Sequence, residues 1–322
     1  MVADNSTSPP RVRQIEIHDD HEGQRIDNFL VTKLKGVPKS RIYRILRKGE
    51  VRVNKGRIKP AYRLKKGDIV RIPPIRTSAQ GSSQNRLLPA LAKRLQKGIL
   101  YDDSNLLILN KPSGIAVHGG SGVSQGVIET LRAAQPEVRF LELVHRLDRD
   151  TSGCLIIARK RSVLRILHEL FRSDGVDKRY WALVEGKWQG GKRRVEAPLR
   201  KNQLASGERI VRVDPQGKNA VTLFKPVCQY PHATLVEAKL ITGRTHQVRV
   251  HAAHIGYPIA GDEKYGSTAF NKLMRTQGLS RLFLHAHSLS FKLSADAVPI
   301  QVNAPLQEEL QALLTRLENS SG

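Results

Sequence analysis

The residues best suited to chemistry lie in one short stretch, where His145, Arg146 and Asp148 precede a Thr-Ser-Gly turn and an apolar run. Asp148 has an arginine on each side, Arg146 and Arg149. A carboxylate among cations suits chemistry on a polyanion, because the arginines attract the substrate while the carboxylate acts as a base or nucleophile. The same short string also fits an aspartate that merely caps a turn. The rest of the chain must therefore decide between the two interpretations.

The chain is strongly basic. Its 322 residues carry 54 Lys and Arg against 29 Asp and Glu, a net charge of +25 with an isoelectric point near 10.4. Residues 39–76 hold fourteen Lys or Arg and only two acids, Glu50 and Asp68, a net charge of +12. Such an excess attracts polyanions through counterion release, and its concentration in one segment indicates a docking surface.

Several classes of protein do not fit the sequence. No apolar run approaches the roughly 20 residues that would cross a bilayer. The first ten residues lack the basic-then-apolar order of a signal peptide. Two cysteines, Cys154 and Cys228, are too few and too far apart for a disulfide framework. We therefore expect a cytoplasmic protein without a membrane partner.

Composition divides the chain into four segments. Residues 1–15, which include two Ser and two Pro, predict a disordered tail, and the polar residues 77–96 predict a linker. Residues 16–76 and 97–322 have the apolar patterns of a small and a larger folded domain.

In the small domain, apolar residues at helical spacing predict helices over residues 25–35 and 38–48. Short strands are predicted at residues 51–53 and 68–72, with an Asn-Lys-Gly turn after the first. This α/β order resembles the RNA-binding module first described in small-subunit ribosomal protein four, the S4 domain. An ordinary solvated basic surface is the alternative. The resemblance implies RNA contacts from the basic side chains of the second helix and the turn region: Lys39, Arg41, Arg44, Lys48, Arg52 and Lys55.

In the larger domain, short apolar runs outnumber helical patterns. Their spacing does not repeat as strand–helix units would, which indicates an α+β domain with a largely antiparallel mixed sheet. Strands are expected near residues 99–101, 105–109, 155–158, 181–184 and 234–236, and helices over 126–135, 162–172 and 307–317.

Three further stretches accompany the Asp148 segment. They are Asn-Lys-Pro-Ser-Gly at 110–114, Lys-Arg-Tyr-Trp-Ala-Leu-Val at 178–184 and Gly-Arg-Thr-His-Gln-Val-Arg at 243–249, the last extended by Gly-Asp at 261–262 and Tyr-Gly at 265–266. Together with His-Arg-Leu-Asp, and in this order, they resemble the pseudouridine synthases that act on ribosomal RNA. The resemblance covers about residues 23–317, and no motif position departs from it.

The resemblance implies an isomerase that converts specific uridines of large-subunit ribosomal RNA to pseudouridine. The bond between ribose C1′ and uracil N1 is cut, the base turns, and C5 joins the same C1′. No atoms enter or leave overall, so we expect neither cofactor nor metal. The implied partner is ribosomal RNA, free or in an assembling particle, and we expect the chain to act as a monomer.

Asp148 stands at the family's catalytic position. The sequence leaves open whether it attacks the sugar, attacks the base or removes a ribose proton. The resemblance implies active-site support from Arg249, the arginine that pairs with the aspartate, from Tyr180, which packs against the uracil, and from His145 and Arg146. Arg146 either fills the space that the extruded base leaves or holds a phosphate. Tyr180 also fits an ordinary core position between apolar neighbours.

Other interpretations stay open at this point. A ribosome-associated RNA-binding or assembly protein would use both domains for docking alone, and a hydrolytic RNA glycosylase would release free uracil. The carboxylate pair Asp148 and Asp150 lacks the Trp cluster typical of glycosidases. Histidines occur without His-Glu-x-x-His or Cys-x-x-Cys spacing, so no metal site is predicted. Polar and apolar residues alternate over residues 247–251, which predicts that Arg249 lies on a strand.

Overall fold

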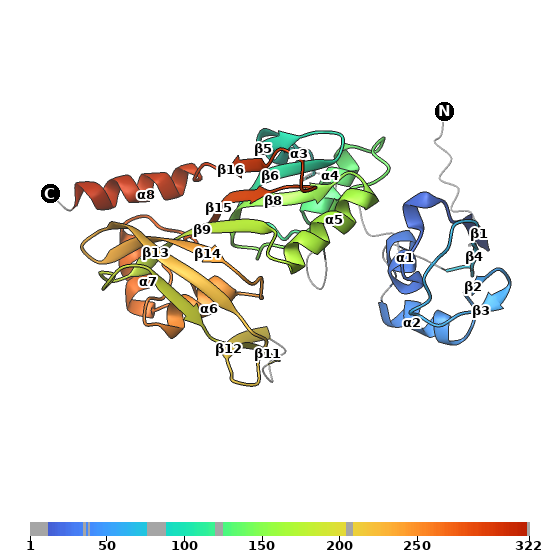
Figure 1. Ribbon diagram of the computed structural model, residues 1–322, viewed down its shortest axis with the longest axis horizontal. Helices are drawn as coiled ribbons and strands as arrows, with labels where there is room; N and C mark the ends of the chain where they lie inside the picture. The colour runs from blue at the N-terminus through green and yellow to red at the C-terminus, as the bar shows by residue number, and fades with distance from the viewer. Residues whose placement is uncertain are drawn as a thin grey trace, which may run out of the picture. The chain divides into compact units, whose positions relative to one another are not determined.

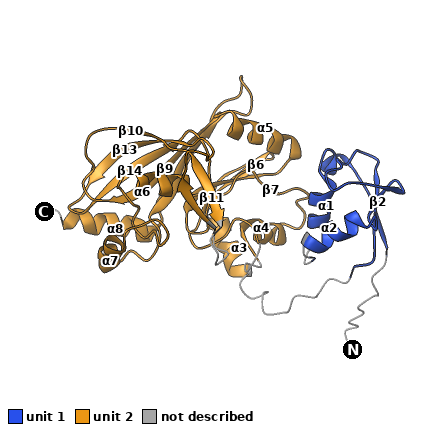
Figure 2. Ribbon diagram, turned by 90° about the horizontal axis from the view of Figure 1, so that it is seen from below, with its two compact units in different colours: residues 1–86 blue, residues 87–322 orange. Residues whose placement is uncertain are grey.

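The computed structural model describes residues 12–34, 37, 39–75, 88–119, 125–203 and 209–320. The chain divides into two compact units, residues 1–86 and 87–322, which are coloured separately in Figure 2. Within the described ranges, no helix has both the length and the apolar character that crossing a bilayer requires.

Unit 1 packs two helices against a four-stranded sheet of strand order β1-β4-β2-β3. Its core joins Phe29 and Leu30 to Ile42 and Val70, all fully buried. The predicted turn is present: Asn54 and Lys55 have φ of 49° and 67°, as a two-residue turn between antiparallel strands requires. The elements are β1 (Arg13–Glu16), α1 (Ile26–Lys33), α2 (Lys39–Arg47), β2 (Arg52–Val53), β3 (Gly56–Arg57) and β4 (Ile69–Ile72).

The predicted boundary between tail and small domain is wrong by a few residues. β1 begins at Arg13, inside the expected disordered tail, and pairs antiparallel with β4. The sequence Arg-Gln-Ile-Glu gives no apolar alternation, because an edge strand with mostly exposed side chains needs little apolar surface. Residues 1–11, the rest of the predicted tail, lie outside the described residues.

Unit 2 is built on a ten-stranded sheet (Figure 1). Its main path runs β10-β13-β14-β9-β15-β8-β6-β5, while β16 pairs with β15, β7 pairs with β8, and β11 and β12 form a separate hairpin. Among the paired strands described, only β15 and β8 run parallel, which confirms the predicted α+β class with a largely antiparallel mixed sheet. The strands are β5 (Ile99–Asp102), β6 (Leu106–Lys111), β7 (Glu142–Leu143), β8 (Ser152–Ala158), β9 (Val176–Glu185), β10 (Arg193–Glu196), β11 (Leu199–Gln203), β12 (Arg209–Val213), β13 (Val221–Gln229), β14 (Ala233–Leu240), β15 (Leu284–Phe291) and β16 (Ile300–Asn303).

Helices cover both faces of the β6–β8 half of this sheet. Leu107 and Leu109 pack toward α3 (Leu88–Lys97) and α4 (Val127–Ala134), whereas Leu106 and Ile108 pack toward α5 (Arg161–Arg172). A strand buried on both faces needs apolar residues at every position. This explains the uninterrupted apolar runs in β6 and β8.

The other half is also covered on both faces. Ala182 and Val184 of β9 face α6 (Gln247–His254), and Leu183 between them faces α7 (Thr268–Thr276) and α8 (Glu308–Asn319). Helices predicted over 126–135, 162–172 and 307–317 correspond to α4, α5 and α8.

The predicted linker is wrong in its second part. Residues 76–87 lie outside the described residues, but α3 occupies 88–97. Leu91 and Leu95 of α3 pack on the sheet. These few apolar residues come directly after a polar run, so the sequence shows no clear helical pattern here. The described part of the larger unit therefore begins at Leu88, within the expected linker.

Arg249 does not lie on a strand, contrary to the prediction. Residues 247–254 form α6, in which Gln247, Val248, Val250 and Ala252 are buried on more than one side. A helix enclosed by its neighbours shows no single apolar stripe. The short alternation of Val with polar residues therefore has the pattern of a strand although the segment is helical.

The close pairing of β8 with β15 leads to a stability prediction. Gly153 has φ of +108°, and a Cβ built there would lie 2.3 Å from the carbonyl oxygen of Ala286. Gly153→Ala should lower the free energy of unfolding by about 3 kcal/mol, because the clash adds to the unfavourable φ. Gly190→Ala is the matched control: φ is +78° but no atom lies within 4 Å, so a loss of about 1 kcal/mol is expected. Urea unfolding measures both, and equal losses would contradict the packing argument.

Candidate active site

A cavity of about 740 Å³ opens where the Asp148 loop, the end of α5, β9 and the segment before α6 meet. Asp148, Tyr180, His145 and Arg146 all line it. Among its lining residues, four Arg or Lys side chains outnumber two Asp side chains, so the cavity favours an anionic ligand. The charged lining residues are Arg146, Arg172, Lys178, Arg244, Asp148 and Asp174.

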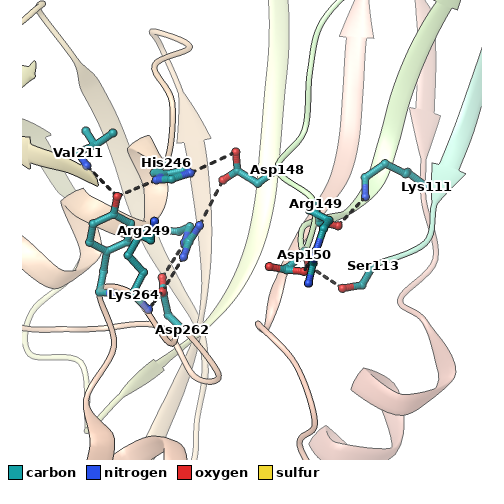
Figure 3. A network of polar contacts seen from close by, with 11 residues as sticks. Lys111, Ser113, Asp148, Arg149, Asp150, Val211, His246, Arg249, Asp262 and Lys264 are labelled. Carbon is teal, nitrogen blue, oxygen red and sulfur yellow. Dashed lines mark hydrogen bonds and ion pairs between the residues drawn. The ribbon is translucent and has the colours of Figure 1, made fainter. Parts of the chain in front are cut away.

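Asp148 lies in the loop between β7 and β8. Its backbone carbonyl accepts a hydrogen bond from Thr151 N at 3.2 Å, so the turn is closed by the backbone rather than by the side chain. The carboxylate is directed toward two other groups (Figure 3). Arg249 Nη1 lies 3.6 Å from Oδ2, and His246 Nε2 lies 3.8 Å from Oδ1. With 20% of its side chain exposed, Asp148 faces the cavity from a largely enclosed position.

The segment after β6 holds the backbone of the Asp148 loop. Fully buried Lys111 donates from Nζ to the carbonyl oxygens of Pro112 (2.9 Å), Ile115 (2.9 Å) and Arg149 (3.1 Å). Ser113 Oγ donates to the carbonyl of Asp150 at 2.7 Å (Figure 3). Burial lowers the pKa of Lys111 to about 7. The Asn-Lys-Pro-Ser-Gly stretch thus holds the two central residues of the turn that follows Asp148.

Arg249 is oriented by a second carboxylate, Asp262. Its Nε and Nη2 both donate to Asp262 at 2.7 Å, and the Asp262 carboxylate also accepts from the backbone N–H groups of Lys264 and Tyr265. Burial acts to lower the pKa of Arg249, but the bonds to Asp262 outweigh it and raise that pKa. This bidentate geometry leaves Nη1 to face Asp148.

A network around Gln247 sets the start of α6. Its Oε1 accepts from Thr242 Oγ1 (2.8 Å) and Arg244 N (2.9 Å), and its Nε2 donates to Val221 O and Thr222 Oγ1, both at 3.0 Å. His246, just before the helix, has φ of +55°. The fixed turn therefore directs His246 and Arg249 toward the same carboxylate.

Tyr180 on β9 combines both roles considered from the sequence. It packs against two of the apolar clusters of unit 2 and also lines the cavity, where it is partly exposed. Burial, followed by the charge of Asp148, raises its pKa. The hydroxyl therefore stays protonated at neutral pH.

His145 and Arg146 occupy different positions in the cavity. His145 Nε2 accepts from Ile156 N at 3.1 Å and its ring stacks on Phe171 at 4.9 Å. Burial lowers the pKa of His145 to about 4, so it is neutral and holds the loop on β8. Arg146 is exposed at the lining of the cavity.

Sequence reasoning missed three side chains of this region: His246, Asp262 and Lys178. His246 and Lys178 line the cavity, and Asp262 holds Arg249. All three lie inside the motif stretches, and this position was the one feature of the sequence that could have pointed to them. Their partners lie up to 98 positions away in sequence, so spacing alone did not show the contacts.

The basic residues predicted to bind RNA belong to unit 1, whereas Asp148 belongs to unit 2. Arg44, Lys48, Arg52 and Lys55 are exposed, and Arg41 is half-buried. The side chain of Lys39 lies outside the described part of α2.

A largely antiparallel sheet, with a loop that turns Asp148 toward a cationic cavity and a buried arginine behind that carboxylate, fits the class of RNA pseudouridine synthases. Residues 105–254 match the family model described as RNA pseudouridylate synthase, and residues 24–70 match the S4 domain. The chain belongs to the RNA pseudouridylate synthase family and carries an N-terminal S4 domain, as the motifs predicted. It is therefore an isomerase.

Particular relatives match nearly the whole chain. Ribosomal large subunit pseudouridine synthase C of Pasteurella multocida is 56% identical over 306 residues, which cover 95% of this chain and 94% of that relative. The protein of the same name in Escherichia coli (strain K12) is 55% identical over 318 residues, 98% and 99% of the two chains. The solved structure of human RNA pseudouridylate synthase domain containing 4 covers 72% of this chain and 97% of its own, with a TM-score of 0.61 and 28% identity.

Removal of the Lys111 ammonium should destabilise unit 2. Lys111→Met keeps the length of the side chain but leaves three carbonyl groups without their donor, so the free energy of unfolding should fall by about 3 kcal/mol. Lys97→Met replaces an exposed lysine on α3 and should change the free energy of unfolding by less than about 0.5 kcal/mol. Denaturant titration followed by tryptophan fluorescence compares the two. If Lys111→Met were as stable as Lys97→Met, the loop would not depend on this ammonium group.

Proposed function

We propose that this enzyme converts uridines of large-subunit ribosomal RNA to pseudouridine, with Asp148 as the catalytic carboxylate. One observation carries the assignment of the site: the Asp148 carboxylate faces a cationic cavity and is held there by Arg249, itself fixed by Asp262. The substrate is supported by the two relatives of 55–56% identity, whose names specify the ribosomal large subunit.

The reaction needs a carboxylate near the junction of ribose and base. The C1′–N1 bond breaks, the freed uracil turns within the cavity, and C5 forms a bond to C1′ while N1 gains a proton and C5 loses one. The overall change is redox-neutral and leaves the atom count unchanged. An ionised Asp148 can serve as nucleophile toward C1′ or the base, or as the base that removes a proton.

The neighbours of Asp148 suit the extruded nucleotide. Tyr180 offers a flat, apolar surface on which the uracil remains stacked while it turns. Extrusion of the base costs a few kcal/mol, and exposed Arg146 either occupies the space left in the RNA or holds a phosphate. Arg249 orients the carboxylate without being consumed in the reaction.

In this proposal, unit 1 supplies affinity for the RNA substrate. Its exposed basic side chains on α2 and near the following turn suit the phosphates of structured RNA. One chain carries both the S4 domain and the cavity, which supports action as a monomer. A ribosomal RNA substrate supports a cytoplasmic site of action.

Loss of the Asp148 charge should abolish catalysis but not binding. Asp148→Asn keeps the shape of the side chain, and tritium release from RNA containing 5-³H-uridine should fall about 1,000-fold or more. The dissociation constant for RNA should stay within about twofold. Asp150→Asn is the control, because Asp150 lies two residues away, is half exposed and pairs with Arg149; it should remain active.

The outcomes separate the remaining classes of function. An Asp148→Asn enzyme that isomerises like the wild type would remove Asp148 from the mechanism. A wild-type protein that binds RNA but releases no tritium would be a docking protein. Free uracil in the chromatogram would identify a hydrolytic glycosylase.

The role of unit 1 is tested by the salt dependence of binding. The triple variant Arg41→Gln, Arg44→Gln, Lys48→Gln should bind ribosomal RNA more weakly at low salt. The slope of log K against log salt should become shallower by about 2, because the loss of three phosphate contacts reduces the number of counterions released on binding. Filter binding between 50 and 200 mM salt measures both quantities.

Three exposed lysines of unit 2 provide the matched control for that variant: Lys187, Lys225 and Lys272. Their replacement by Gln removes the same net charge elsewhere on the chain. A slope that changes equally in both triple variants would mean that total charge, rather than the face of α2, governs RNA binding.

A further inference from the structure

A chain of polar contacts reaches Asp148 from the β11–β12 hairpin. The backbone N of Val211 on β12 lies 2.9 Å from Tyr265 Oη, and Tyr265 Oη lies 2.7 Å from His246 Nδ1. On the other side of the same ring, His246 Nε2 lies 3.8 Å from Asp148 Oδ1 (Figure 3). The imidazole therefore stands between the tyrosine hydroxyl and the carboxylate.

The direction of these contacts follows from the groups at the two ends, a backbone N–H and a carboxylate. A backbone N–H can only donate, so Val211 donates to Tyr265 Oη. The Tyr265 hydroxyl can then give its own proton to His246 Nδ1, because the reverse direction would turn the lone pair of Nε2 toward the negative Asp148 carboxylate. A neutral imidazole that accepts at Nδ1 carries its proton at Nε2. The N–H group of His246 thus faces Asp148.

We propose that His246 is a positioning residue for Asp148, held by Tyr265 as the neutral tautomer that presents Nε2–H to Oδ1. Arg249 Nη1 faces the other oxygen, Oδ2. Rotation of a carboxylate about its last bond is only weakly restricted by its own torsion, so one partner does not fix its plane. Two donors, one for each oxygen, fix the plane of the carboxylate. The proposal rests on the proposed catalytic role of Asp148.

The neutral state of His246 is part of this role. Burial lowers its pKa, and the positive charges of Arg249 and Lys264 act in the same direction, against the opposing charges of Asp148 and Asp262. A protonated imidazole would add a second full positive charge beside Asp148 and reduce its reactivity. A neutral N–H orients the carboxylate while leaving its charge available.

The separations of 3.6 and 3.8 Å are longer than hydrogen bonds. Contacts of catalytic groups are often long without substrate and shorten when it binds. The αL conformation of His246 and the four hydrogen bonds of Gln247 fix the start of α6. Lys111 and Ser113 hold the backbone of the Asp148 loop, so the adjustment falls to the Asp148 side chain.

Tyr265→Phe tests the tautomer directly. It removes the hydroxyl but keeps the aromatic ring, which lies 5.0 Å from the guanidinium carbon of Arg249. In ¹⁵N-histidine NMR spectra of the whole enzyme, the signal absent from His246→Gln identifies His246. The wild type should show the Nε2–H tautomer, and Tyr265→Phe should lose that preference. An Nδ1–H tautomer in the wild type would overturn the proposal.

Kinetics tests the consequence for catalysis. His246→Ala should lower kcat for tritium release about 100-fold with KM unchanged within twofold, because orientation rather than binding is lost. His246→Gln, whose amide can replace the N–H donor, should recover most of the activity. Tyr265→Phe should lose about tenfold in kcat, and it carries the kinetic test if His246→Ala does not fold. Full activity of His246→Ala or Tyr265→Phe would overturn the positioning role.

Asp148→Asn separates this proposal from the proposed function. If Asp148→Asn is inactive while His246→Ala and Tyr265→Phe are fully active, only the positioning role fails. If Asp148→Asn remains active, the catalytic role of Asp148 fails, and the positioning role fails with it.

Discussion

The buried pair of Arg249 and Asp262 is the interaction on which the rest of the site depends. Asp262 takes two of the guanidinium donors at 2.7 Å and is itself tied to the backbone of residues 264 and 265. Without it, the guanidinium would be free to form the same bidentate pair with Asp148, and a carboxylate neutralised in that way reacts poorly. Asp262 thus allows Arg249 to orient Asp148 from a distance.

The sheet explains how segments far apart in sequence reach one cavity. β6 and β8 place Lys111 under the Asp148 loop, β9 contributes Tyr180, and the turn before α6 contributes His246. Helices on both faces make these strands rigid, because each strand packs on two sides. The side chains that these elements contribute to the cavity are therefore held with little freedom.

Much of this architecture could be predicted from the sequence, and the failures have physical causes. The strands β6 and β8 and the helices α1, α2, α5 and α8 have strong apolar patterns and were expected. The sequence predicts a strand for the segment that carries Arg249, because a helix buried on several sides loses its apolar stripe. The positions of His246 and Asp262 depend on tertiary pairing, which periodicity does not encode.

The parallel pairing of β8 with β15 has a consequence for protein synthesis. Ser152 and His285 are joined by a buried hydrogen bond of 2.8 Å across 133 positions of sequence. Closing so long a loop is slow, and it cannot begin before β15 exists. A nascent chain that has emerged only as far as residue 266 already carries every motif but lacks β15, the strand that pairs with β8 and β9. Newly translated molecules therefore complete the sheet beside the catalytic loop only after β15 has been synthesised.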